Sequence, residues 1–208
     1  MVAEAEELPT ISDDLVVTKY KMAAEIVNSE WRLRINVRKR NTCIAGVLKE
    51  LSEACKVSSS VRDLCILGDT RLGEETGKAF KKDKKLTKGI AFPTCISVNN
   101  CICHFSPLVS EADVVLADGD VVKIDMGAHI DGFIAVVAHT VVVGASAENP
   151  VVGRKADALL AAHLASEAAL RLVKPGNDTY EVTETVSKIG EAFDCKVSQS
   201  VQSVHILA

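Results

Sequence analysis

The strongest constraint on the fold of this chain is a pair of β-rich runs joined by an Asp-Gly dipeptide. The runs are Val121–Ile130 and residues 133–143, and Asp131-Gly132 separates them. Asp and Gly both tolerate the positive φ that a two-residue type I′ turn requires. The sequence therefore predicts an antiparallel hairpin at this point.

The register of this hairpin decides which side chains share a face of the sheet. With the turn at Asp131-Gly132, Gly127 lies opposite Val136. Side chains alternate between the two faces along a strand, so Asp125, Gly127 and Val136 are expected on the same face. Asp125 and Val136 are then diagonal neighbours across the two strands.

Helical patterns precede the hairpin. Asp13 or Asp14 can cap a first helix, whose apolar stripe is formed by Val16, Tyr20, Ala23 and Val27. A second helix is expected over Val47–Ala54. Ser60, with Asp63 three residues later as in a capping box, predicts the start of a third helix.

Short apolar runs and further helices complete the pattern. Residues 90–98 and 102–105 resemble β-strands, and residues 157–173 predict a helix that ends at Lys174-Pro175-Gly176. Asp178 or Thr179 can cap a last helix. Its buried stripe is expected to comprise Val182, Val186, Ile189 and Phe193. Helices on either side of an antiparallel hairpin predict the α+β class.

Composition narrows the class of protein and its compartment. The net charge is −4, so the whole molecule is not a general polyanion binder. Seven cysteines, an odd number without a CxxC pair, favour a reducing cytosolic or nuclear compartment. The apolar runs are shorter than the roughly 20 residues that cross a membrane, so no membrane insertion is expected.

Several motifs in order resemble one known family. Residues 92–107 and 123–134 resemble methionine aminopeptidases of the second type. The non-peptidase branch of that family, the proliferation-associated or ErbB-receptor-binding proteins, is closer still. The segments similar to that branch are residues 17–21, 75–78, 153–157 and 170–176.

This resemblance implies a pita-bread (creatinase/aminopeptidase) fold, of which the chain would hold the N-terminal half only. Residues 1–12 are then expected to be a disordered acidic leader and residues 13–195 a partial aminopeptidase-like domain. Residues 29–42 are interpreted as an insertion, and residues 196–208 as a divergent tail.

The resemblance also implies a two-metal site with two Asp, one His and two Glu ligands. Asp125 matches the first Asp, but Val136 occupies the position of the second, and an isopropyl group has no lone pair to donate. The other ligands would lie beyond the matched region. The expectation is therefore no metal, no cofactor and no enzyme activity.

Three residues are interpreted as a relic pocket: His104, which would line the substrate site in the family, together with Asp125 and Val136. A partly buried structural role for His104 is an equal alternative, and Asp125 is favoured to cap a turn or accept backbone hydrogen bonds. Zinc binding by Cys101, Cys103 and His104 is disfavoured, because strand alternation would point Cys103 and His104 apart.

Two basic segments are candidate nucleic-acid contacts, although charge runs are more often solvated faces. The candidate residues are Arg38, Lys39, Arg40, Lys81, Lys82, Lys84, Lys85 and Lys88. The resemblance implies structured RNA or ribosomes and regulatory proteins as partners, in the cytoplasm and in the nucleus or nucleolus.

Three functions compete on these observations. The leading hypothesis is a non-catalytic binding module in growth regulation. The alternatives are an active metal-dependent methionine aminopeptidase and a truncated splice product without independent function. Half of a pita-bread fold would leave its sheet without a partner, which predicts self-association through that sheet.

Overall fold

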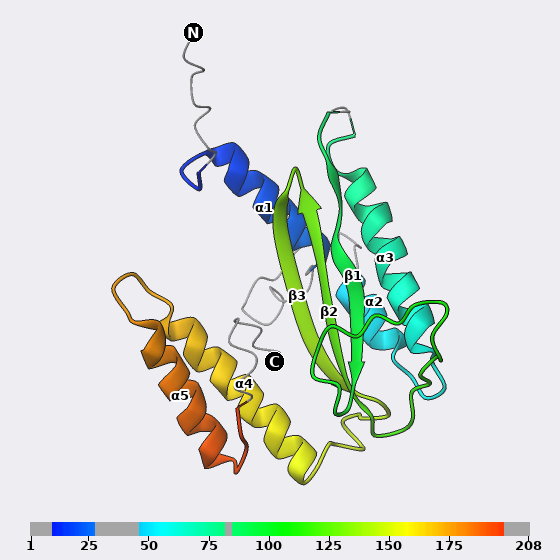
Figure 1. Ribbon diagram of the computed structural model, residues 1–208, viewed down its shortest axis with the longest axis vertical. Helices are drawn as coiled ribbons and strands as arrows, with labels where there is room; N and C mark the ends of the chain where they lie inside the picture. The colour runs from blue at the N-terminus through cyan, green and yellow to red at the C-terminus, as the bar shows by residue number, and fades with distance from the viewer. Residues whose placement is uncertain (1–9, 28–45, 82–84, 198–208) are drawn as a thin grey trace.

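The computed structural model describes residues 10–27, 46–81 and 85–197 (Figure 1). The expected insertion at 29–42 and all but two residues of the expected tail lie outside the described residues. Helices and strands follow in the order α1 (Asp14–Val27), α2 (Val47–Ala54), α3 (Val61–Lys78), β1 (Lys88–Val98), β2 (Val121–Ile130), β3 (Phe133–Val142), α4 (Arg154–Leu172) and α5 (Thr179–Ala192).

The three strands form an antiparallel sheet in the order β1-β2-β3. The hairpin prediction is confirmed: Asp131 and Gly132 have φ values of 55° and 80°, and the β2–β3 register runs without interruption from Val121 to Val142. Gly127 pairs with Val136 as predicted.

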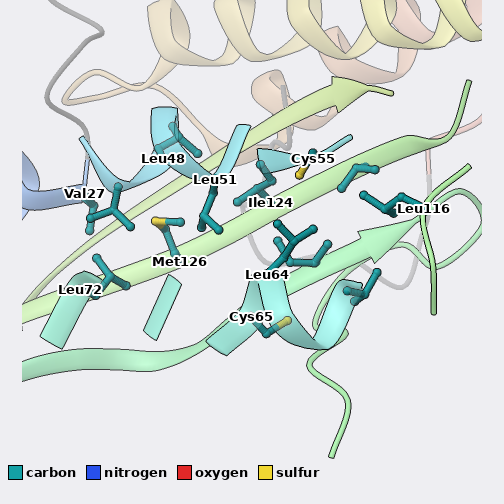
Figure 2. Packing of buried hydrophobic residues seen from close by; sticks show 14 of the residues in the cluster. Val27, Leu48, Leu51, Cys55, Leu64, Cys65, Leu72, Leu116, Ile124 and Met126 are labelled. Carbon is teal, nitrogen blue, oxygen red and sulfur yellow. The ribbon is translucent and has the colours of Figure 1, made fainter. Parts of the chain in front are cut away.

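One face of the sheet is covered by α1, α2 and α3, and the main core lies between these layers (Figures 1 and 2). The inward side chains of β2 are fully buried, and those of Ile124 and Met126 are 0% exposed. They pack against Leu51 from α2 and against Leu64 and Leu72 from α3. The alternation of β2 therefore places its other side chains on the opposite, open face.

Helix α3 begins where its capping residue predicts. The backbone N–H of Asp63 donates to Ser60 Oγ at 3.0 Å, which satisfies one of the free amides of the first turn. The helix ends at Lys78. The Lys88 ammonium reaches back from β1 and donates to the carbonyls of Gly77 and Ala79, so it closes the C-terminal end of α3.

The stripe predicted for α1 is partly wrong. Val16, Ala23 and Val27 are buried, but Tyr20 is 42% exposed while Lys19 is only 8% exposed. Lys19 Nζ lies 2.5 Å from Asp131 Oδ2, so an ion pair between the helix and the hairpin turn explains why a charged residue is buried.

Helices α4 and α5 pack against each other, beside the sheet rather than on it (Figure 1). The buried positions of α4 are Ala161, Ala165 and Ala169. The apolar stripe predicted for α5 is less buried than expected. Its members are only half-buried: Val182, Val186, Ile189 and Phe193. The buried residue of this helix is Gly190.

The second apolar run near β1 is not a strand. Residues 101–105 form a loop that begins at Asn99, whose φ is 51°. Phe105 returns beside β1, because its carbonyl accepts a 2.8 Å hydrogen bond from Ile96 N–H. The expected strand at 102–105 was wrong because local hydropathy does not distinguish a strand from an apolar loop held by tertiary contacts.

Candidate functional site

Asp125 lies at the centre of the open face, on the middle strand of the sheet. Its Cα partners are Cys95 on β1 and Ala138 on β3, and its side chain is only 3% exposed. Burial raises the pKa of the Cys95 thiol to about 11, and the nearby Asp125 carboxylate adds to this shift. The thiol is therefore protonated at neutral pH.

Val136 and Gly127 lie beside Asp125 on the same face. Because Val136 pairs with Gly127, its alkyl side chain is the diagonal neighbour of the buried Asp125 carboxylate on β3. The Val136 side chain is 56% exposed. A Cβ built on Gly127 would come within 2.7 Å of Phe92 Cε1, which shows that the Phe92 ring lies directly over this glycine. Sequence reasoning missed Phe92, although a glycine inside a strand is a recognised sign of close approach.

His104 lies in the loop that follows β1. It is exposed and has a φ of 59°, and it immediately precedes Phe105, whose N–H donates to Ser97 Oγ on β1 at 3.2 Å. His104 therefore borders β1, Asp125 lies on β2, and Val136 lies on β3. Asp125 and Val136 thus share the open face, His104 lies in a loop beside β1, and the role of the three residues as a pocket stays a prediction.

Lys123 adds a cation to this face that the sequence reasoning did not single out. Lys123 lies two residues before Asp125 on β2, so both side chains are on the same face, and Lys123 Nζ donates to the Asn99 carbonyl at 2.8 Å. Burial lowers the pKa of Lys123, while Cys101 and Cys103 nearby act in the opposite direction. The ammonium thus secures the start of the loop that carries His104.

The donors gathered here do not fit a two-metal site. Hard divalent ions need oxygen or imidazole ligands, and a bridged pair needs shared carboxylates. Asp125 supplies one carboxylate, Val136 supplies no donor, and the protonated Cys95 thiol is a poor ligand. No step of a metal-dependent reaction follows from these residues.

The argument from strand alternation against a zinc site at Cys101, Cys103 and His104 is wrong. Cys101, Cys103 and His104 lie in a loop, so strand alternation does not determine their directions. The Cys101 thiol approaches the Cys103 carbonyl, with Sγ 3.9 Å from the oxygen. In the part of the chain that the structure describes, no group of three or more His, Cys, Asp or Glu side chains has a metal-binding arrangement.

The basic candidates separate into three groups. Lys81 and Lys85 are exposed in the connection between α3 and β1. Lys88 is instead half-buried and bonded to the end of α3, which gives it a structural role. The remaining candidates lie outside the described residues: Arg38, Lys39, Arg40, Lys82 and Lys84.

No helix among the described residues is long and apolar enough to span a membrane.

Comparison with known proteins places these features in a family. Residues 36–202 match the profile of metallopeptidase family M24. The chain is 49% identical over 201 residues to "ERBB-3 binding protein 1" of Solanum tuberosum, covering 96% of this chain and 46% of that protein. It is 43% identical to "Proliferation-associated protein A" of Dictyostelium discoideum, covering 90% and 45%. The chain thus spans about half the length of the curated relatives it matches.

Solved structures confirm the expected fold. A thermophilic Arx1 superposes with a TM-score of 0.67 and 28% identity, over 88% of this chain and 50% of the other. Methionine aminopeptidase from Thermotoga maritima superposes with a TM-score of 0.62 and 21% identity, over 89% and 63%. The resemblance to the proliferation-associated branch and the pita-bread prediction, for about half of that fold, are both confirmed.

Proposed function

The chain belongs to metallopeptidase family M24, and from that premise we propose that it is a non-catalytic, aminopeptidase-like binding protein. One observation carries the proposal. Val136 lies on the open face beside Asp125, at the position where the resemblance implies a second carboxylate. An alkyl side chain there removes the donor that a bridged metal pair needs.

The surroundings of Asp125 support the same conclusion. The carboxylate is buried beside a thiol whose pKa is raised to about 11, and the Phe92 ring covers the neighbouring glycine. These neighbours are apolar or neutral groups. They add no further oxygen or imidazole ligand that two divalent ions beside Asp125 would need.

Metal analysis combined with an aminopeptidase assay tests the non-catalytic proposal. The protein is equilibrated with Mn²⁺, Co²⁺ or Zn²⁺, separated from free metal, and assayed with a peptide that begins with methionine. We expect neither stoichiometric metal nor turnover. We expect the same of Val136→Asp, because a second carboxylate still leaves most of the ligand set incomplete. Bound metal together with turnover in the parent protein would overturn the proposal.

The active aminopeptidase remains the competing function, because curated relatives include "Probable metalloprotease ARX1" of Candida albicans, which is 32% identical to this chain. The same assay separates the two. A third alternative, a product without independent function, would show neither turnover nor the binding described next.

We propose that the binding function serves growth regulation, through structured RNA or ribosomes or through regulatory proteins, in the cytoplasm and nucleus or nucleolus. The names of the relatives, "ERBB-3 binding protein 1" and "Proliferation-associated protein A", support a role in binding. Lys81 and Lys85 support a contact with phosphates, because both are exposed on one short connection.

A titration with a structured RNA tests the phosphate contact. The double variant Lys81→Glu/Lys85→Glu is compared with Lys174→Glu, which reverses another exposed lysine at the turn between α4 and α5. We expect the double variant alone to weaken binding and to flatten its salt dependence, by about one unit of slope for each lysine–phosphate ion pair removed. Equal binding by both variants would remove these lysines from the interface.

A further inference from the structure

Two half-buried thiols lie one residue apart in the loop that follows β1. Cys101 and Cys103 are both free, and exposure alternates along residues 101–105, in which Ile102 and His104 are exposed. The two thiols are therefore turned to the same, less exposed side of the loop. Cys101 Sγ lies 3.9 Å from the carbonyl oxygen of Cys103, so this sulfur already leans toward the residue with which a disulfide would form.

The loop is held to β1 on both sides of the two thiols. Before them, the backbone N–H of Cys101 donates to the Val98 carbonyl at 3.0 Å. After them, the N–H of Phe105 donates to Ser97 Oγ at 3.2 Å. Because both ends of the segment are fixed and one residue separates the thiols, little entropy is lost when the sulfurs meet.

Lys123 on β2 places an ammonium group beside this pair. Its Nζ donates to the carbonyl of Asn99, two residues before Cys101, at 2.8 Å. Burial lowers the pKa of Lys123, and the charges of Cys101 and Cys103 act in the opposite direction, so both sulfurs lie within electrostatic reach of the ammonium. A nearby cation stabilises a thiolate, which is the form of cysteine that reacts with oxidants.

The other described cysteines lack this combination. Cys55, Cys65 and Cys95 are buried, and burial raises the pKa of each thiol to about 11, so they stay protonated and unreactive at neutral pH. Cys195 is half-buried, but no other cysteine lies near it in the sequence. Partial exposure, a neighbouring cation and a partner thiol therefore coincide in the loop after β1.

We propose that Cys101 and Cys103 form a site of reversible oxidation, at which hydrogen peroxide joins the two sulfurs in a disulfide within the loop. One thiol ionises, and its thiolate attacks a peroxide oxygen. The O–O bond breaks, a sulfenic acid forms, and the leaving hydroxide takes up the released proton to give water. The second thiol then attacks the sulfenic sulfur, and its proton leaves with the displaced hydroxide as another water. The two sulfurs are oxidised, and the peroxide is reduced to water.

The small size of the ring makes this oxidation reversible. A disulfide that spans a single intervening residue is strained, and strained disulfides are reduced more easily than structural ones. A thiol such as glutathione should therefore open it again. The site uses neither Lys81 nor Lys85, so this inference and the proposed phosphate contact can fail independently.

Mass spectrometry of the 208-residue chain tests the proposal. The reduced protein is treated with hydrogen peroxide, its remaining thiols are alkylated after denaturation, and the peptides are sequenced. We expect Cys101 and Cys103 to escape alkylation together in a peptide that has lost two hydrogens, while Cys95 is alkylated. Treatment with glutathione before alkylation should restore both thiols.

Variants separate the two steps and the role of the ammonium. Cys103→Ser should stop the reaction at a sulfenic acid on Cys101, which dimedone traps, whereas the matched control Cys195→Ser should still form the disulfide. We expect Lys123→Met to slow disulfide formation by roughly 5-fold, because the charge beside the thiolate is lost. Lys123→Arg keeps the charge and should stay close to the parent rate.

Each other outcome counts against the proposal. Thiols that resist peroxide in the folded chain overturn it, and so does a disulfide that joins either residue to Cys95 or to a second chain. Equal rates for Lys123→Met and the parent would remove the ammonium from the site. Circular dichroism of each variant shows that a changed rate does not come from unfolding.

Discussion

Two glycines of one helix are expected to respond to the same substitution with opposite signs. Gly68 and Gly73 both lie within α3 (Val61–Lys78), where alanine is intrinsically more stable than glycine by about 1 kcal/mol. The surroundings of the two positions differ. Gly68 is buried against β1, whereas Gly73 is exposed.

The close approach at Gly68 sets the magnitude. A Cβ there would lie 2.5 Å from Thr94 Oγ1, 2.7 Å from Cγ2 and 2.9 Å from Cβ. Carbon atoms in contact are normally about 3.5–4.0 Å apart, so α3 and β1 would have to separate by roughly 1 Å. Thr94 cannot move aside easily, because it is 0% exposed and its N–H is bonded to Asp69 Oδ1 at 2.8 Å.

Overpacking of this kind costs up to about 3 kcal/mol, which exceeds the gain in helix propensity. We therefore expect Gly68→Ala to lower the free energy of unfolding by about 2 kcal/mol. Gly73→Ala, whose Cβ meets nothing within 4 Å, should raise it by about 0.5–1 kcal/mol.

Denaturant unfolding of both variants measures this difference, and the melting temperature should move by about 2–4 °C per kcal/mol. Adding Thr94→Ala to Gly68→Ala should restore part of the stability, because two of the three clashing atoms are removed. A Gly68→Ala protein as stable as the parent would refute the close packing of α3 on β1.

Two further predictions concern buried polar groups. The Lys19–Asp131 pair, with 11% and 39% exposed side chains, should show a coupling of about 1–2 kcal/mol in a cycle of Lys19→Met and Asp131→Asn, above the value of an exposed pair. A coupling indistinguishable from zero would contradict its role. Burial raises the pKa values of Cys55, Cys65 and Cys95 from 9.0 to about 11. The unfolded chain therefore releases these protons first, and the free energy of unfolding should be unaffected by them below pH 9.0 and fall between 9.0 and about 11. Unfolding curves across that range check the sign, and an unchanged slope in Cys55→Ala would contradict it.

Local patterns were sufficient wherever structure depends on near neighbours in the chain. The Asp131-Gly132 turn was predictable because its backbone needs two positive φ values, and few residues adopt them. The start of α3 at Ser60 was predictable for a similar reason, since its hydroxyl bonds an amide only three residues away. Once the turn was fixed, the pairing of Gly127 with Val136 followed from the regular spacing of strands.

The candidate site was predictable only in part. The sequence located Asp125 and Val136 on one face, but it did not indicate that Asp125 is buried while Val136 is exposed. It also did not place the Phe92 ring over Gly127. These facts depend on β1, which reaches the hairpin from a distant part of the sequence.

The sequence by itself thus determined the hairpin, its register, the start of α3 and the family, because each depends on short-range stereochemistry or on motifs read in order. Tertiary structure decided which side chains are buried. Lys19 is enclosed through its contact with Asp131, which is distant in sequence, and residues 101–105 form a loop because Phe105 bonds back to Ile96. Hydropathy along the chain carries no information about such partners, because burial depends on which surfaces meet in three dimensions.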